Sequence, residues 1–304
     1  MQLPSYWKNF EEEVLNRVNT LCKSNIWGLQ RDSLRAWFNN FQKEEHKYLA
    51  LHILDRLTYR SKDMAHAAYS SYVRTKLKSH AADFFGINQL SMCQWLEGIR
   101  RHGTTEFENL KLIAVSKKYD TADSGKVILR MLTSELFNQS HELSCDELIA
   151  QGHKGLLIIL IDDFVGSGQQ FIDFARDYKL SEIMVSNKVL YAPLMAYKPG
   201  IDVIAKAYPN LNIEPLEVLD ESDHFFSFSD DKLFCGDDEI TEQEFISCYE
   251  EIRVLSGHKK SMWYGRDKLC LTVAFEWGVP NQSLGCLWLD SKPNWHNLVC
   301  RRER

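Results

Sequence analysis

A short run near the middle of the chain, LLIILIDDFVGSGQQF (residues 156–171), most constrains what this sequence can fold into. An apolar segment ends in two adjacent aspartates, and a glycine-rich turn then precedes a segment with helical spacing. Such a run predicts a buried strand of a parallel sheet, because strands covered on both faces read as continuous hydrophobic segments. The polar residues after it would lie at the carboxyl end of the strand, where open α/β sheets bind ligands.

The acidic pair, Asp162 and Asp163, and the turn that follows it suit a sugar phosphate. Adjacent strand residues point to opposite faces, so the two carboxylates are not expected to work as a matched acid–base pair. We expect one to hold sugar hydroxyls or a hydrated Mg²⁺, and the other to fix the loop or a second hydroxyl. The amides of Gly166–Gly168, the Ser167 hydroxyl and the following helix N-terminus would bind a phosphate. A Gly-x-Gly turn taken alone is more often structural.

Strands and helices alternate on both sides of this run. Segment 109–137 reads as strand, loop and helix, and segment 188–197 as a second apolar strand that precedes a helix over 200–208. This alternation predicts a mostly parallel sheet covered by helices, so the expected fold class is α/β, of the Rossmann type. Pro193 lies inside the second strand and predicts a bulge or an early strand end, because proline has no amide donor.

The first part of the chain reads differently, as successive amphipathic helices without strand-like alternation. We therefore predict a helical N-terminal domain over residues 1–95 and an α/β domain over residues 96–304. Near the end, Thr241 and Glu244 form a capping-box pattern before a helix that stops near Gly257. Segments 268–275 and 283–289 then look like strands, which we expect to add a cover to the sheet domain.

Composition limits the partners and the compartment. The formal net charge is −6, which disfavours a general nucleic-acid coat or a polybasic membrane binder. The 8 cysteines show no metal-type spacing, and no apolar run is long enough to span a bilayer, so we expect a cytoplasmic chain with reduced thiols. The basic segments 74–80 and 100–101 could contact phosphates, although solvated helix faces explain such segments more often.

A second loop, YDTADSGKVILR (residues 119–130), has related chemistry. It follows the first strand of the α/β region and opens a helix, so Ser124, Gly125 and Lys126 would present amides and a cation to an anion. An ordinary helix cap formed by Asp123 or Ser124 is the structural alternative.

The run at 156–171 resembles the phosphoribosyl pyrophosphate motif of type I phosphoribosyltransferases. The resemblance implies that Asp162 and Asp163 bind the ribose hydroxyls, and that the segment Val165, Gly166, Ser167, Gly168 and Gln169 wraps the 5′-phosphate. Asp123 to Lys126 would then face the pyrophosphate, with Mg²⁺ as cofactor. Most of the chain, including the tail WYGRDKLCLTVAFEWGVPNQSLGCLWL, is similar to the phosphoribosyltransferase-like family of bacterial conflict systems.

The resemblance implies a role in antiphage defence, in systems that include some built around a reverse transcriptase and its retron DNA. Type I transferases usually insert a flexible hairpin that closes over the ligand, and residues 137–155 are too few to supply it. Two functions therefore stay open. One is an enzyme that transfers or cleaves at ribose C1′, closed by the N-terminal helices, the tail or a partner protein. The other is an inactive nucleotide-sensing module that signals to a partner.

Overall fold

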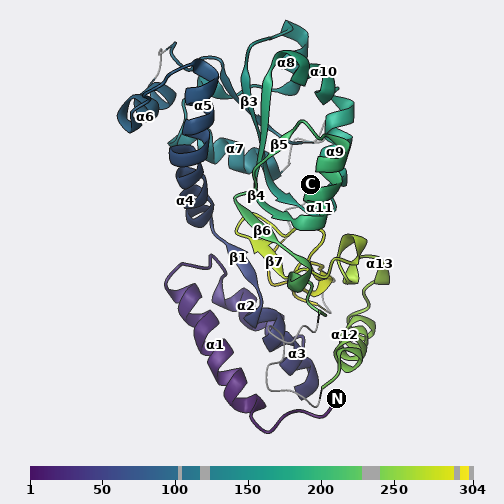
Figure 1. Cartoon of the computed structure of the whole chain (residues 1–304). Helices are drawn as coiled ribbons and strands as arrows, with labels where there is room; N and C mark the ends of the chain where they lie inside the picture. Colours follow the sequence, from purple (N-terminus) through teal and green to yellow (C-terminus); the bar gives the residue numbers. More distant parts are fainter. Residues whose placement is uncertain (102–104, 117–123, 228–239, 291–294, 301–304) are drawn as a thin grey trace. The chain divides into compact units, whose positions relative to one another are not determined.

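The computed structural model describes residues 1–101, 105–116, 124–227, 240–290 and 295–300 (Figure 1). The chain forms two compact units. Unit 1 contains Met1–Lys62 together with Asp220–Glu303, and unit 2 contains Asp63–Leu219. The division expected at residue 95 therefore differs from the one in the structure, in which the helices after residue 62 go with the sheet.

Unit 2 is built on a parallel sheet in the strand order β2-β3-β4-β5, with β6 also paired to β4. The strands are β2 (Leu110–Ala114), β3 (Leu157–Val165), β4 (Lys188–Tyr197), β5 (Asn212–Ile213) and β6 (Glu217–Leu219). Every pair in this sheet is parallel. The α/β fold class with a mostly parallel sheet is thus confirmed, and the apolar run of 156–161 forms the buried centre of the sheet.

Helices cover both faces of this sheet. They are α4 (Lys62–Tyr72), η1 (Val73–Leu77), α5 (Lys78–Phe85), α6 (Met92–Arg100), α7 (Ser124–Glu135), η2 (Gln139–His141), α8 (Cys145–Gln151), α9 (Gln169–Asp177), α10 (Leu180–Ser186) and α11 (Lys198–Ala207). On one face, Ile158, Leu160 and Tyr191 pack in a core with residues of α8, α9 and α11. Alternate residues such as Ala192 face the other way, where Tyr69 of α4 reaches the sheet. Figure 1 shows α4 and α7 on one side of the sheet and α9 and α11 on the other.

Pro193 does not end β4, contrary to the sequence-based expectation. The strand continues to Tyr197, and Pro193 pairs in register with Asp162. On this side of β4, the pairing partner changes from β5 before Pro193 to β6 after it. Between the two, the Leu216 amide donates to the Pro193 carbonyl at 3.0 Å. A proline fits where the neighbouring strand is interrupted, because its missing amide leaves no ladder bond unmade there.

Unit 1 joins the two ends of the chain around one core. Its elements are α1 (Trp7–Lys23), α2 (Arg31–Phe38), α3 (Glu44–Asp55), β1 (Thr58–Arg60), η3 (Glu221–Asp223), α12 (Glu242–Ser256), α13 (Lys260–Trp263), η4 (Arg266–Lys268), β7 (Val273–Phe275) and η5 (Gly285–Leu287). Strand β1 pairs in parallel with β7, and buried residues from 7–59 and 225–299 form a single cluster. The tail therefore completes the core of the N-terminal helices.

Three local expectations for unit 1 can be compared with the structure. The capping box of Thr241 and Glu244 opens α12, and Gly257 ends it in the left-handed conformation, as predicted. The strand expected over 268–275 is shortened to β7, and the one expected over 283–289 is wrong, because Gly285–Leu287 forms a 3₁₀ turn. The short β1 is a strand that helical spacing did not indicate.

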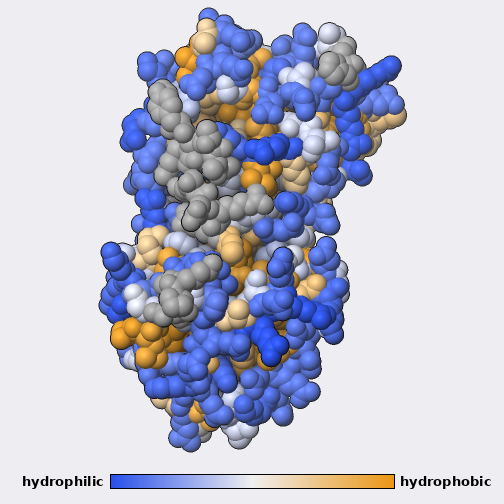
Figure 2. All heavy atoms as spheres, turned by 180° about the vertical axis from the view of Figure 1, so that it is seen from behind, coloured by the Kyte–Doolittle hydropathy of each residue, from blue (hydrophilic) through white to orange (hydrophobic). Residues whose placement is uncertain are grey.

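In the described part of the chain, no helix is long and apolar enough to cross a bilayer. The face shown in Figure 2 is mostly hydrophilic, with apolar residues in separate patches. Cys270 and Cys286 are buried among apolar residues.

A buried imidazole in unit 1 makes the stability of the fold dependent on pH. His52 lies among Phe10, Tyr48 and Phe245 and is 7% exposed. Burial, together with the charge of Arg56, lowers the pKa of His52 from 6.5 to about 3. The unfolded chain binds this proton at a higher pH than the folded chain, so stability falls as the pH drops from 6.5 towards 3.

Because of this pKa difference, we expect the contribution of His52 to make the free energy of unfolding about 2 kcal/mol lower at pH 5 than at pH 8. His52→Leu should flatten that part of the dependence, measured by urea unfolding at several pH values. His296→Leu, at an exposed side chain, is the control and should keep the wild-type slope. Equal slopes in all three proteins would contradict the assignment.

Candidate functional site

The acidic pair lies inside β3 and not at its end. The strand runs on to Val165, and both Asp162 and Asp163 are buried, with exposed fractions of 2% and 7%. The expectation that the carboxylates follow the strand is therefore wrong by a few residues. Because β3 and β4 stay paired to Val165 and Ala196, the sheet itself fixes the direction of both side chains.

Asp162 is held by a buried tyrosine of the next strand. The Tyr191 hydroxyl donates to Asp162 Oδ2 at 3.0 Å, and the Asp163 amide donates to Asp162 Oδ1 at 2.9 Å. Burial raises the pKa of Tyr191 well above its ordinary value, and the Asp162 charge adds to the shift. The hydroxyl therefore stays protonated and remains a donor to the carboxylate.

A second buried tyrosine, Tyr69 of α4, contacts the backbone at the same level. Its hydroxyl lies 2.9 Å from the Ala192 carbonyl and 3.2 Å from the Asp162 carbonyl. Burial raises the pKa of Tyr69 well above its ordinary value, with a contribution from Asp162. Helix α4 is thereby attached to β3 and β4 beside the acidic pair.

Asp163 connects β3 to the start of α7. The Ser124 hydroxyl, on the first residue of α7, donates to Asp163 Oδ1 at 2.8 Å. Gly125 allows this close approach, because a Cβ there would lie 3.1 Å from the Val115 carbonyl oxygen and 3.6 Å from Asp162 Oδ1. Lys126 follows in the first turn of α7, and Asp123 lies outside the described residues. The structure thus brings Ser124 and Gly125 together with both aspartates.

The glycine-rich turn leads directly into α9. Gly168 adopts the left-handed conformation with φ of +79°, and α9 begins at Gln169. No side chain caps this helix end and no acidic residue lies in its first turn, among the described residues. Its first amides therefore have the geometry and partial charge that attract an anion. The Gln169 side chain donates to Asp173 at 3.0 Å, so it lies along its own helix.

Two other members of the predicted segment lie in different surroundings. Val165 is the last residue of β3, and its side chain is in the core, 4% exposed. Ser167 is half-buried at the turn. Only backbone groups at Val165 are therefore in a position to contact a ligand, whereas Ser167 has a hydroxyl near the surface.

Helix α11 lies against the turn through Gly200, which the sequence did not single out. A Cβ at Gly200 would lie 2.0 Å from the Gly166 carbonyl oxygen and 3.1 Å from the Gly168 amide nitrogen. A Cβ at Gly168 would lie 2.7 Å from the Gly200 carbonyl oxygen. The turn and the first turn of α11 therefore touch backbone to backbone. A glycine just after Pro199 at a helix start was the available signal.

The described residues do not form a metal site of their own. They include no group of three or more His, Cys, Asp or Glu side chains that could hold an ion. Both oxygens of Asp162 already accept hydrogen bonds from the protein. Mg²⁺ usually keeps several waters and uses few protein carboxylates beside substrate phosphates. The donor set does not fit a protein-built Mg²⁺ site.

In unit 2, a parallel sheet has the starts of α7 and α9 beyond the carboxyl ends of the adjacent strands β2 and β3, which is a phosphoribosyltransferase-like arrangement. The sequence pattern of the PRTase-CE family matches residues 34–301, and the chain therefore belongs to this family. Among solved structures, an orotate phosphoribosyltransferase from Aeropyrum pernix is similar, with 11% identity over 46% of this chain and 69% of that chain and a TM-score of 0.25. Comparison with curated proteins gave no match.

Proposed function

We propose that unit 2 binds a 5′-phosphorylated ribose, as phosphoribosyl pyrophosphate or a nucleotide, across the starts of α7 and α9. The observation that carries the proposal is the 2.8 Å hydrogen bond from Ser124 to Asp163, because it holds the start of α7 against β3, the strand that leads into the turn before α9. The uncapped N-terminus of α9 would take the 5′-phosphate through backbone amides. The start of α7, with Lys126, would face the pyrophosphate or base.

The two aspartates have different parts in this proposal. Asp163 would exchange its bond to Ser124 for ribose hydroxyls when the ligand enters. Asp162, whose oxygens face Tyr191 and the Asp163 amide, would hold the strand and the Asp163 backbone in place. Mg²⁺ would arrive with the pyrophosphate of the ligand and not occupy a preformed cage.

The chemistry proposed is transfer or cleavage at ribose C1′. Amides at the start of α7 and the Lys126 ammonium would stabilise the charge that develops on a leaving pyrophosphate. The acceptor would enter on the face of the ribose opposite the leaving group. A role in antiphage defence, including retron-containing systems, is part of the proposal and follows from the resemblance of the sequence.

A sensing module is the second candidate, and one feature favours it. Between α7 and β3 the chain forms η2 and α8, and residues 137–155 contain no hairpin. Water exclusion over the ribose would then need another segment or a partner protein. A chain without such closure would bind the nucleotide and signal to a partner.

Asp163→Asn is expected to weaken ligand binding by about 10-fold or more, because a hydrogen bond to a charged group contributes about 1.5–3 kcal/mol. Calorimetry with phosphoribosyl pyrophosphate and common nucleotides, with and without Mg²⁺, measures this change. Asp177→Asn, at an exposed carboxylate of α9, is the charge-matched control. If the wild-type chain binds none of these ligands, the proposal is wrong.

Mass spectrometry of the same mixtures separates the two candidates. An enzyme would release pyrophosphate or a free base with multiple turnovers, alone or once a partner protein is added. A sensing module would return the ligand intact under both conditions. In either case the binding defect of Asp163→Asn is expected.

A further inference from the structure

A π-helical turn interrupts the helix that covers one face of the unit 2 sheet. Helix α4 continues without a break through η1, a π-helix over Val73–Leu77, into α5. Five of the six buried residues of this continuous helix recur at every fourth position, Ala65, Tyr69, Val73, Leu77 and Ala81, and the sixth is Tyr72. An α-helix has 3.6 residues per turn, so each step of four drifts by roughly 40° around the axis.

The π turn corrects this drift. Four steps of four residues would carry the last buried side chain roughly 160° away from the first in a pure α-helix. A π turn, with hydrogen bonds from i to i+5, widens the helix and keeps the buried row facing the core. The buried Trp95 of α6 fixes the turn, because its indole Nε1 donates to the Val73 carbonyl at 2.9 Å. Such turns occur frequently at functional sites.

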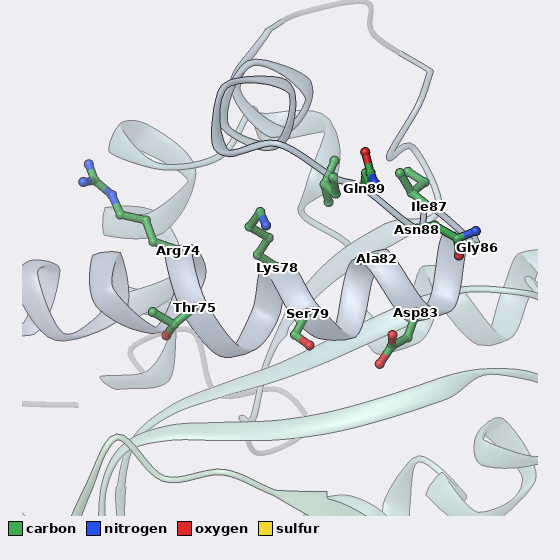
Figure 3. Close-up of a pocket in the computed structure, with 11 residues that line it drawn as sticks. Arg74, Thr75, Lys78, Ser79, Ala82, Asp83, Gly86, Ile87, Asn88 and Gln89 are labelled. Carbon is green, nitrogen blue, oxygen red and sulfur yellow. The ribbon is translucent and has the colours of Figure 1, made fainter.

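The same turn aligns the outward-facing residues beside a hollow. A cavity of about 590 Å³ lies between this helix and the segment that follows it, lined by Arg74, Thr75, Lys78, Ser79, Ala82, Asp83 and residues 86–90. Figure 3 shows Arg74 and Lys78 projecting to the side on which segment 87–89 lies. Thr75, Ser79 and Asp83 project to the opposite side. The volume falls within the range of small-molecule sites.

Two of the side chains that line the hollow, Arg74 and Lys78, are cations. Neither the Arg74 nor the Lys78 side chain has an ion pair or hydrogen bond with another described residue. Arg74 and Lys78 are four residues apart on the continuous helix, so the two cations lie next to each other on one side of it. The amides of Asn88 and Gln89 add donors on the same side. This side suits phosphate oxygens.

The lining residues on the other side of the helix have different chemistry. Thr75 and Ser79 supply hydroxyls. The Thr75 hydroxyl donates its proton to the Ser71 carbonyl at 2.7 Å, so its oxygen can only accept from a ligand. Asp83 supplies an exposed carboxylate. These groups accept hydrogen bonds from sugar hydroxyls or from the amino groups of a base. A ligand with phosphate at one end and donors at the other matches the hollow.

We propose that the hollow between η1, α5 and residues 86–90 is a second binding site, for the phosphate and sugar of a nucleotide. Arg74 and Lys78 would bind the phosphate, and Ser79 and Asp83 the sugar or base. This site uses none of the residues of the α7 and α9 loops. The nucleotide is either free or part of a single-stranded nucleic acid, and both present the same groups.

The test compares two double variants. The pocket variant is Arg74→Gln/Lys78→Gln, and the control pair is Lys76→Gln/Lys154→Gln. The control pair removes the same charge from exposed side chains that do not line the hollow. The probes are ATP, ribose 5-phosphate, inorganic phosphate and a single-stranded 15-mer oligonucleotide, and affinity is measured by fluorescence anisotropy or calorimetry. The set is repeated in Asp163→Asn, so that binding at the α7 and α9 loops is separated from binding at the hollow.

We expect the pocket variant to lose at least about 10-fold in affinity for ATP or the oligonucleotide, and the control pair to keep it. Tighter binding of ATP than of the oligonucleotide identifies a free nucleotide. If the ligand is a nucleic acid, the pocket variant loses two phosphate contacts. The slope of log affinity against log salt concentration should then be about 1.4 smaller in magnitude for this variant than for the wild type. Equal affinities of both variants for every probe, or no binding of any probe by the wild type, overturns the proposal.

Discussion

Gly200→Ala is expected to reduce binding of a phosphoribosyl ligand by about 10- to 100-fold, since a hydrogen bond to a charged phosphate contributes about 1.5–3 kcal/mol. The added Cβ would lie 2.0 Å from the Gly166 carbonyl oxygen, well inside van der Waals contact. Either α11 or the turn of Gly166–Gly168 must move. That turn precedes the α9 amides to which we assign the phosphate, so the shift reaches the proposed site directly.

We expect Gly200→Ala to destabilise unit 2, although helix propensity alone would predict stabilisation. Alanine is about 1 kcal/mol better than glycine inside a helix, so the substitution would ordinarily stabilise α11. Overpacking against rigid backbone costs about 1–3 kcal/mol, which outweighs that gain. Thermal unfolding and ligand calorimetry measure the two effects separately.

Gly278→Ala is the matched control, because a Cβ there would meet nothing within 4 Å. This variant should keep both stability and binding. A Gly200→Ala protein with wild-type stability and binding would show that the contact between α11 and the turn is loose. Lost stability with intact binding would place the ligand away from the α9 amides.

The sheet could be predicted from the sequence because its signals are local. The continuous apolar run of β3 and the alternation of strands with helices are read directly along the chain. The position at which a strand ends depends less on the local sequence. The β3–β4 ladder extends through both aspartates and Pro193 because tertiary pairing with β4 stabilises it, and no residue of β3 itself indicates that extension.

The division into units could not be predicted for a related reason. Helical spacing shows which face of a helix is apolar and does not show what that face packs against. Helix α4 and the N-terminal helix α3 have similar patterns, yet Tyr69 of α4 bonds to the sheet of unit 2 and α3 belongs to the core of unit 1. The pairing of β1 with β7 joins segments more than 200 residues apart, which local patterns cannot reveal.

The candidate site was predicted in part. Loop chemistry indicated Ser124, Gly125 and the two aspartates, and the structure brings these residues together. The supporting residues were missed because their role depends on packing. Tyr191 reads as one more apolar strand residue, and Tyr69 as one more buried helix residue. Their hydroxyls become relevant only when the strand and helix meet Asp162.

Asp162→Ala is expected to destabilise unit 2 by about 2–5 kcal/mol, while Asp163→Ala should cost about 1 kcal/mol. Removing the Asp162 carboxylate leaves the fully buried Tyr191 hydroxyl and the Asp163 amide without these acceptors. Asp163→Ala removes the bond from Ser124, at the start of α7. Hydrogen exchange of the β3 and β4 amides, with urea unfolding, measures the difference.

Tyr191→Phe completes the argument as a double-mutant cycle. If the carboxylate and the hydroxyl act as a pair, the Asp162→Ala/Tyr191→Phe protein should be destabilised less than the sum of the single variants, by about 1.5–3 kcal/mol. The buried hydroxyl is then absent together with its partner, so the double variant does not leave it unsatisfied. Additive costs would mean that Asp162 is not held by Tyr191, and Asp162 would then be available to the ligand as well. A coupled pair instead assigns the ribose to Asp163 alone, because the Asp162 carboxylate is then committed to the structure of the sheet.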